Sequence, residues 1–259
     1  MKTAATAFDA LARSYDQDFV GTRIGTRMRD AIWRRCAARF PAGTSVLEMN
    51  CGTGVDAAWL AARGVDVLAT DTSVAMLEVA REKAGNHNWP GKLRFQQLSW
   101  EQLDSLQESG FDGALSNFGG LNCVEDLKRA AKALAVKLRP GATALLCIMG
   151  PLVPWEWVWF LAHGQSAKAF RRLRRGGAVW SGVSIHYPTV GAVRRCFRPE
   201  FKMVRAAAIG AVLPPPYTEP FFAQHARTLA VLDYVERRCE RLWPLPQLAD
   251  HYLLEMVRL

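Results

Sequence analysis

The sequence predicts an α/β fold with a doubly wound, mostly parallel sheet of seven strands, and three observations support this prediction. Residues 44–149 alternate short apolar runs with helical stretches. The apolar runs lack the strict apolar–polar alternation of a sheet with one solvent-facing side, so they suit parallel strands covered by helices on both faces. The connections between them are short, as in right-handed strand–helix–strand units.

The elements expected in this core follow one another closely. The predicted strands are residues 45–49, 65–70, 93–98, 111–117 and 142–149. The predicted helices between them are residues 53–63, 73–84 and 125–138. Gly64, Gly85 and the Pro140-Gly141 pair stand where these helices should end, and Ser73 is the expected N-cap of the second.

The flanking segments divide the chain into four parts. Helices are expected over 5–15 and 22–40 before the core, and a helix, strand, helix and strand over 189–197, 201–213, 221–241 and 251–258 after it. The parts are an N-terminal helical cap (1–43), the core (44–150), a basic, Trp-rich lid (151–187), and the rest of the sheet with a second insert near 213–248 (188–259). The inserts after strands 5 and 6 should form a lid at the carboxyl edge of the sheet, where open α/β sheets bind ligands.

Charge is unevenly distributed along the chain. The net charge is +9, and residues 151–213 hold ten Lys/Arg against two Asp/Glu. This excess indicates either a solvated basic face or a surface for an anionic partner. Residues 145–162 are the most apolar stretch, but Pro151, Pro154 and Glu156 interrupt it, so no membrane-spanning helix is expected. Residues 1–12 are not expected to form a secretory signal.

The six cysteines show no metal or disulfide pattern. None forms a C-x-x-C pair or alternates with histidine at zinc spacing. The sequence therefore predicts reduced thiols, no metal site and a cytoplasmic location.

The strongest motif is the turn after the first strand, V-L-E-M-N-C-G-T-G over residues 46–54. Gly52 and Gly54 let backbone N–H groups approach a ligand without obstruction by a side chain. Asp71 follows Gly52 by 19 residues and ends the second strand. A carboxylate there can accept the ribose hydroxyls of an adenosine, so the first turn is the predicted nucleotide-type site.

These residues resemble the S-adenosylmethionine (SAM) binding core of class I, Rossmann-like methyltransferases. Residues 48–54 are similar to the family's acidic-x-G-x-G-x-G turn, with Asn50 at the first glycine position, and the G-x-G-x-x-G spacing of dinucleotide enzymes is absent. Asn tolerates the left-handed backbone angles that glycine usually supplies there. The resemblance implies that SAM is the cofactor and that Glu48 lies near its methionine amino group.

The resemblance covers residues 5–150. Residues 8–16 resemble the F-D-x-x-A-x-x-Y-D opening helix of the ubiquinone/menaquinone-type group, whose tyrosine, here Tyr15, closes over the cofactor. Ser99 stands at the family's adenine contact, Trp100 is expected to stack on the adenine, and residues 111–118 and 138–141 resemble the fourth strand and the L-x-P-G-G turn. The implied cofactor-binding residues are Tyr15, Glu48, Asn50, Gly52, Gly54, Asp71, Thr72, Met76, Ser99, Trp100 and Asn117.

No catalytic motif is equally clear. Residues 116–119 read S-N-F-G where several amino-group methyltransferases carry N-P-P-Y. Methyl transfer needs in-line placement of the nucleophile and, for a hydroxyl or an acidic carbon, removal of a proton. The candidate bases are Glu156, His163, His186 and Tyr187 in the lid, with His251 at the start of the last strand ranked below them.

The lid suggests the class of acceptor. Trp155 and Trp159 share one helix face and either pack on the sheet or line an apolar pocket. Four arginines, Arg171, Arg172, Arg174 and Arg175, suit an anionic group. The predicted acceptor is a small organic molecule, partly apolar and anionic. The alternatives are an RNA or protein methyltransferase that docks through the basic lid, and a non-catalytic SAM-binding protein; nucleic acid is disfavoured because no RNA-binding module is attached.

Overall fold

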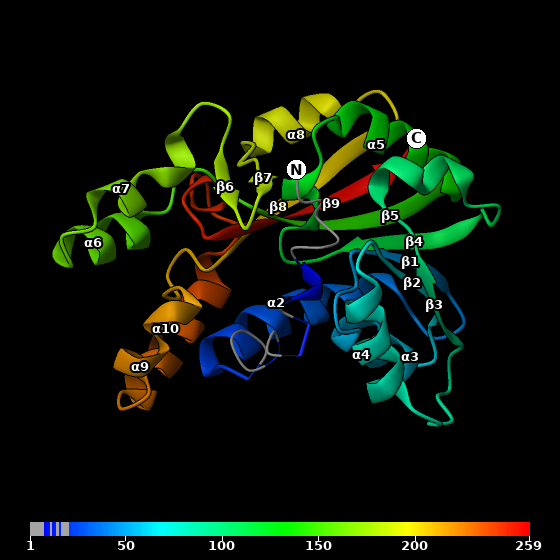
Figure 1. Ribbon diagram of the computed structural model, residues 1–259, viewed down its shortest axis with the longest axis horizontal. Coiled ribbons are helices and arrows are strands. Elements are labelled where there is room, and N and C mark those ends of the chain that lie inside the picture. Colours follow the sequence, from blue (N-terminus) through cyan, green and yellow to red (C-terminus); the bar gives the residue numbers. More distant parts are fainter. Residues whose placement is uncertain (1–7, 11, 14–15, 17–20) are drawn as a thin grey trace.

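The sheet has seven strands in the order β3-β2-β1-β4-β5-β9-β8 (Figure 1). The computed structural model describes residues 8–10, 12–13, 16 and 21–259. The strands are β1 (Ser45–Met49), β2 (Asp66–Asp71), β3 (Leu93–Gln97), β4 (Phe111–Ser116), β5 (Leu138–Met149), β8 (Phe201–Ile209) and β9 (His251–Arg258). Strands β1 to β5 are parallel, and β9 runs antiparallel to both neighbours, β5 and β8. The predicted mostly parallel, seven-stranded α/β fold is confirmed.

Helices cover both faces of the sheet. They are α2 (Arg23–Arg39), α3 (Val55–Ala61) and α4 (Val74–Ala84) on one face, and α5 (Leu127–Lys137) and α8 (Val190–Cys196) on the other. Successive residues of β5 supply the two sides in turn: Leu145 and Cys147 pack with α2 and α3, whereas Leu146 and Ile148 pack with α5 and α8. Because both faces are buried, these strands are continuously apolar.

Local signals placed most helix ends correctly. The Ser73 hydroxyl accepts from the Met76 N–H at 3.1 Å, so Ser73 is the N-cap of α4 as predicted, and Gly85 follows its last residue. Strand β5 begins at Leu138 rather than at residue 142, with Pro140 and Gly141 inside it. The reason is tertiary: the chain leaves α5 already extended and Leu138 pairs at once with Phe111 of β4.

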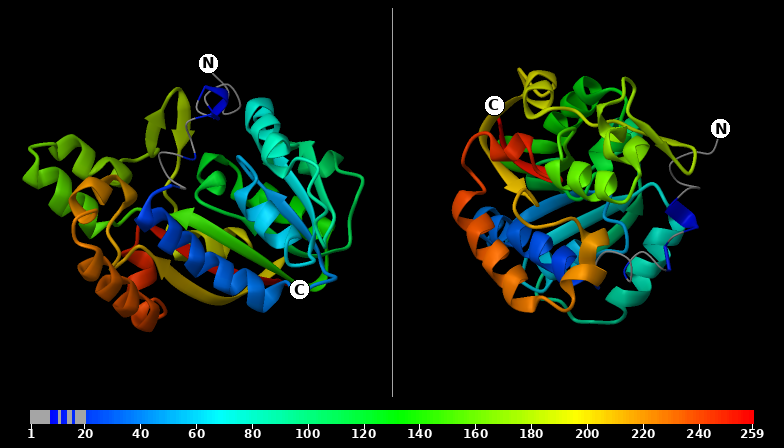
Figure 2. Two further views of the ribbon diagram at one scale, coloured as in Figure 1. Left: turned by 90° about the horizontal axis from the view of Figure 1, so that it is seen from below. Right: turned by 90° about the vertical axis from the view of Figure 1, so that its left-hand side faces the viewer.

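Two inserts lie at one end of the molecule (Figures 1 and 2). The first holds α6 (Pro154–Ala162), α7 (Ser166–Ala169) and a hairpin of β6 (Ala178–Trp180) and β7 (Val183–Ile185), which the sequence reading missed. The second holds α9 (Glu219–Phe222) and α10 (Ala226–Cys239). The ring centroids of Trp155 and Phe222 lie 6.3 Å apart, and the Trp159 ring contacts the rings of Tyr217 and Phe221. The tryptophan pair therefore packs the two inserts against each other.

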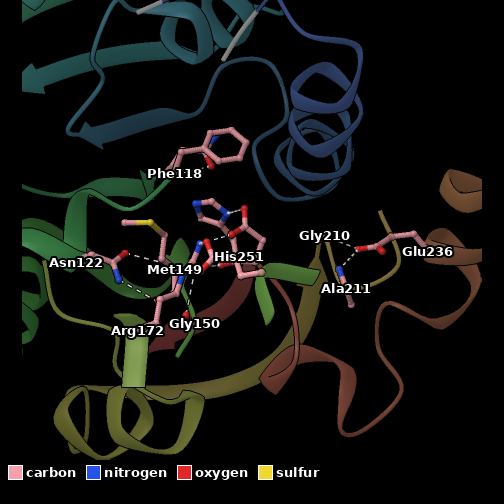
Figure 3. A network of polar contacts seen from close by, with 12 residues as sticks. Phe118, Asn122, Met149, Gly150, Arg172, Gly210, Ala211, Glu236 and His251 are labelled. Carbon is pink, nitrogen blue, oxygen red and sulfur yellow. Dashed lines mark hydrogen bonds and ion pairs between the residues drawn. The ribbon is translucent and has the colours of Figure 1, made fainter. Parts of the chain in front are cut away.

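The second insert is held against α2 and the end of β8. Glu236 on α10 accepts backbone N–H groups from the four consecutive residues 210–213 at 2.6–3.2 Å (Figure 3). Glu240 at the end of α10 forms an ion pair with Arg35 of α2. Among the helices that the structure describes, none is long and apolar enough to cross a membrane.

Candidate cofactor and acceptor site

A cavity of about 610 Å³ opens at the carboxyl ends of β1, β2 and β4. Its lining includes most of the predicted cofactor residues, namely Asn50, Gly52, Asp71, Thr72, Met76, Ser99, Trp100 and Asn117. The hairpin of the first insert supplies another wall, with Trp180 and Ile185. No described residue of the second insert lines the cavity, so only the first insert has the position that the lid prediction gave to both.

The turn after β1 is cross-linked to the loop after β4. Asn50 has a φ of 53°, the left-handed angle expected where the family carries glycine. Its side-chain amide donates to the Asn117 carbonyl at 2.9 Å and accepts from the Ser116 hydroxyl at 2.7 Å. An asparagine therefore replaces the first glycine without backbone conflict and adds two hydrogen bonds that hold the cavity wall.

The two glycines of the turn have different roles. Gly52 and Gly54 have φ values of 54° and 76°. A Cβ on Gly52 would meet no atom within 4 Å, because the position faces the cavity. A Cβ on Gly54 would lie 2.8 Å from the Cβ of Ala80. Gly52 thus leaves room for a ligand, whereas Gly54 lets the turn pack against α4.

Asp71 presents a fixed carboxylate to the cavity. One oxygen accepts from the Gly52 N–H at 2.8 Å and the other from the Ser73 N–H at 2.9 Å. Burial raises the pKa of Asp71, and these backbone hydrogen bonds oppose that shift. Each carboxylate oxygen retains acceptor capacity, so the pair is placed to receive a ribose diol.

Glu48 is buried next to the cavity-lining Met49 and lacks a full set of partners. Burial raises its pKa well above the usual range, and the charges of Asp56 and Asp71 add to the shift while Arg29 opposes it. Its Oε2 atom has no hydrogen-bond partner within the described part of the chain. A buried carboxyl oxygen of this kind needs a partner, but Glu48 does not itself line the cavity. The fit to the cofactor rests on Gly52, which leaves open space at the cavity, and on Asp71, whose fixed carboxylate lines it.

Trp100 lines the cavity, and Ser99 caps the short helix that carries it. The Ser99 hydroxyl accepts from the Gln102 N–H at 3.3 Å, and the Gln102 side chain accepts from the Ser99 N–H at 3.2 Å. This reciprocal cap begins the short helix that carries Trp100. Serine therefore has a structural reason to stand where the family has an acid.

Two acids of the opening motif fasten the N-terminal segment to the site. Asp9 accepts from the Ser73 hydroxyl at 2.5 Å, and Asp16 accepts from the Thr53 hydroxyl at 2.6 Å and pairs with Lys83. These contacts join the segment to the loops after β2 and β1. Tyr15 lies outside the described residues, so its role over the cofactor stays a prediction.

The candidate bases are scattered. Tyr187 lines the cavity, whereas Glu156, His163 and His186 do not. His163 is exposed and pairs with the Trp159 carbonyl of its own helix, and Glu156 is buried in ion pairs with two arginines. His251, ranked last from sequence, lines the cavity. Its signal was its position at the start of the last strand, which the sheet brings to the edge where β4 and β5 end.

Arg172 is an internal residue of the first insert. Its guanidinium donates to Glu156 at 2.9 Å, to the Asp250 carboxylate at 2.5 Å, and to the Gly150 and Asp250 carbonyls (Figure 3). Arg171 pairs with Glu156 at 2.5 Å and lines the cavity. Of the four arginines assigned to an anionic acceptor, Arg172 is therefore engaged inside the protein, and Arg171 alone lines the cavity.

Comparisons with known proteins agree with this site. Residues 46–141 match the family described as methyltransferase domain. The chain is 32% identical over 143 residues to a demethylmenaquinone methyltransferase from Clavibacter sepedonicus. The aligned region covers 54% of this chain and 55% of that protein. A demethylmenaquinone methyltransferase from Mycobacterium sp. strain JLS is 32% identical over 151 residues, 55% of this chain and 58% of its own. The chain thus covers little more than half the length of these relatives.

Solved structures share the fold. The geranyl diphosphate C-methyltransferase from Streptomyces coelicolor A3(2) aligns with a TM-score of 0.58 at 13% identity, over 89% of this chain and 75% of that one. The methyltransferase in a complex with the Haloferax volcanii Trm112 activator aligns with a TM-score of 0.58 at 16% identity, over 99% and 97%.

Fold, turn and family match agree with one another. Residues 46–141 match a methyltransferase domain, and the sheet order and the cavity at the turn after β1 agree with the class I fold and the SAM cofactor that the sequence predicted. Within that class, its sequence relatives belong to the menaquinone-type group.

Proposed function

We propose that this protein transfers a methyl group from SAM to a small, partly apolar organic acceptor. The observation that supports this most is that one cavity is lined both by Gly52 and Asp71 and by the apolar Trp180 and Ile185 of the first insert. SAM supplies an electrophilic methyl group on a sulfonium. The protein's part is to hold cofactor and acceptor in line and to keep water away.

The cofactor residues have separable tasks in this proposal. Asp71 accepts the ribose hydroxyls, Glu48 pairs with the ammonium group, and the Trp100 ring stacks on the adenine. Asn50 and Asn117 hold the wall between the turn and the loop after β4.

Substitution of Asp71 by alanine should weaken binding of S-adenosylhomocysteine. The ribose diol would lose charge-assisted hydrogen bonds of about 1.5–3 kcal/mol, so the Kd should rise at least about tenfold. Isothermal titration measures this. The matched control is Asp104→Ala, because Asp104 is an exposed acid away from the cavity. An unchanged Kd in folded Asp71→Ala protein would contradict the assignment.

The acceptor end of the cavity favours an apolar body with one polar or anionic group. Phe118, Met149, Trp180 and Ile185 contribute apolar surface, and Arg171 adds a single guanidinium. Because the relatives are named demethylmenaquinone methyltransferases, the hydroquinone form of a short-chain demethylmenaquinone is the first acceptor to test. Tritium from methyl-labelled SAM should enter an organic-extractable product. Label in precipitable RNA or protein would favour a macromolecular acceptor, and SAM binding without transfer would favour a non-catalytic protein.

We also propose that the first insert contacts anionic lipid surfaces reversibly. Lys168, Arg174 and Arg175 are exposed. The same insert exposes apolar side chains, namely Val158, Leu161, Phe170 and Leu173. Cationic side chains with adjacent apolar groups are typical of segments that lie in a membrane interface.

The charge contribution can be measured by neutralising these three residues. A Lys168→Gln, Arg174→Gln, Arg175→Gln variant should bind vesicles containing anionic phospholipid more weakly, by about 1 kcal/mol per charge or roughly fivefold each. The control variant Arg194→Gln, Arg195→Gln, Arg198→Gln removes the same charge from exposed positions in and just after α8. Equal losses in both variants would show an effect of net charge alone, and no loss in either would remove the proposed contact.

We also propose that the protein works in the cytoplasm. All six cysteines are free thiols, and burial raises the pKa of Cys36, Cys51 and Cys147. Such thiols are unreactive and suit a reducing compartment.

A further inference from the structure

His251 and Asp250 form a close pair at the start of β9. Nδ1 of His251 lies 3.1 Å from a carboxylate oxygen of Asp250. The imidazole ring lines the cavity, and the Phe118 ring packs edge-on against it with centroids 5.4 Å apart (Figure 3). Nδ1 is buried and has no aligned hydrogen bond with any described residue, and the Asp250 carboxylate lies within hydrogen-bond distance of it.

Asp250 is held in its charged form. Burial by itself would raise its pKa, but Arg172 and His251 keep the pKa below the usual range. Its other carboxylate oxygen accepts from Arg172 at 2.5 Å. An ionised carboxylate beside Nδ1 favours the tautomer with the proton on Nδ1, which leaves the lone pair on Nε2.

Arg172 and His251 use different oxygens of this carboxylate. Arg172 pairs with Oδ1 of Asp250 and also with Glu156, which Arg171 pairs with as well, so two arginines serve the two acids. Oδ2 of Asp250 is the atom that faces Nδ1 of His251.

The other titratable groups that line the cavity are less suited to accept a proton. Burial raises the pKa of Tyr187 and raises the pKa of Cys123 to about 11, so both are protonated at neutral pH and hold their protons firmly. Asp71 already accepts two backbone N–H groups. Glu101 is exposed and follows Trp100 directly in the chain.

We propose that His251 is the general base of the methyl transfer and that Asp250 is the residue that positions it. The inference rests on the proposed function and narrows the acceptor to one that loses a proton, a hydroxyl or an acidic carbon. The acceptor atom forms a bond to the methyl carbon while its proton moves to Nε2 of His251. The carbon–sulfur bond breaks with its electron pair on sulfur, which leaves S-adenosylhomocysteine, methylated acceptor and an imidazolium that releases its proton to water.

The tautomer of His251 tests the pair without any acceptor. Long-range ¹H–¹⁵N spectra of the full chain resolve the ring nitrogens of its five histidines, and loss of one set in His251→Gln assigns it. The expected result is the Nδ1–H tautomer in the wild type and loss of that preference in Asp250→Asn. An Nε2–H tautomer in the wild type, or no change in Asp250→Asn, would overturn the proposal.

Turnover tests the base itself. With the short-chain demethylmenaquinone hydroquinone as probe, His251→Gln should lower kcat by about 100-fold or more while the Kd for S-adenosylhomocysteine stays unchanged. His163→Gln is the matched control, because His163 is exposed just after α6 and does not line the cavity. Full kcat in His251→Gln would overturn the assignment. Absence of transfer by the wild type would instead count against the proposed function, and the tautomer result would still decide the pair.

Discussion

Replacement of Gly52 by valine should abolish binding of S-adenosylhomocysteine while the fold remains. At a φ of 54°, a residue with a side chain loses about 1–2 kcal/mol of folding free energy, and a β-branched residue such as valine loses the most. No atom lies within 4 Å of the new Cβ, so the valine would extend into the cavity where the cofactor belongs. The clash removes binding, and isothermal titration should show at least about a 100-fold loss, equivalent to about 2.7 kcal/mol.

Gly110→Val separates strain from obstruction. Gly110 has a φ of 81°, and a Cβ there would also meet nothing within 4 Å, but the residue is exposed and does not line the cavity. Its variant should lose similar stability and bind S-adenosylhomocysteine normally. Retained binding in folded Gly52→Val, or equal loss in both variants, would show that the turn after β1 does not approach the ligand.

Replacement of Arg172 by alanine should cost about 3–5 kcal/mol of folding free energy, because it leaves the buried Asp250 without its arginine partner and the buried Glu156 with Arg171 alone. For a domain of this size the midpoint of thermal unfolding should fall by roughly 10 °C. Calorimetry at neutral pH measures both. Arg174→Ala is the control: Arg174 is exposed and donates to one backbone carbonyl, so its loss should stay within about 0.5 kcal/mol.

The deficit of Arg172→Ala should also depend on pH. In the wild type, the depressed pKa of Asp250 contributes stability above the pKa of an unfolded Asp, and this contribution is lost as the pH falls through the folded value. In the variant, Asp250 has lost its arginine partner and gains a proton more readily, which relieves the cost of burying its charge at low pH. The two stabilities should therefore converge as the pH falls. A deficit no larger than that of Arg174→Ala at neutral pH would mean that Arg172 is available for a ligand.

Much of what the sequence predicted depends on residues that are neighbours along the chain. Val46, Leu47 and Leu145 lie in continuously apolar runs, which is sufficient to indicate strands buried on both faces. Gly52, Gly54 and Asp71 are bound to the ends of such strands by short loops, so their meeting at one sheet edge follows from the parallel topology. The meeting of Gly52 and Asp71 at one cavity was predictable for this reason.

Only the tertiary structure decided the acceptor end. Arg172 and Arg174 belong to one basic run, yet Arg172 is buried between Glu156 and Asp250 while Arg174 is exposed. Asp250 is 78 residues away from Arg172, so no local pattern distinguishes the two arginines. His251 likewise reaches the cavity because β9 inserts antiparallel between β5 and β8, which brings the start of the last strand beside the ends of β4 and β5. Ion pairs and cavity walls depend on distances across the fold, whereas strands, turns and caps depend on neighbours along the chain.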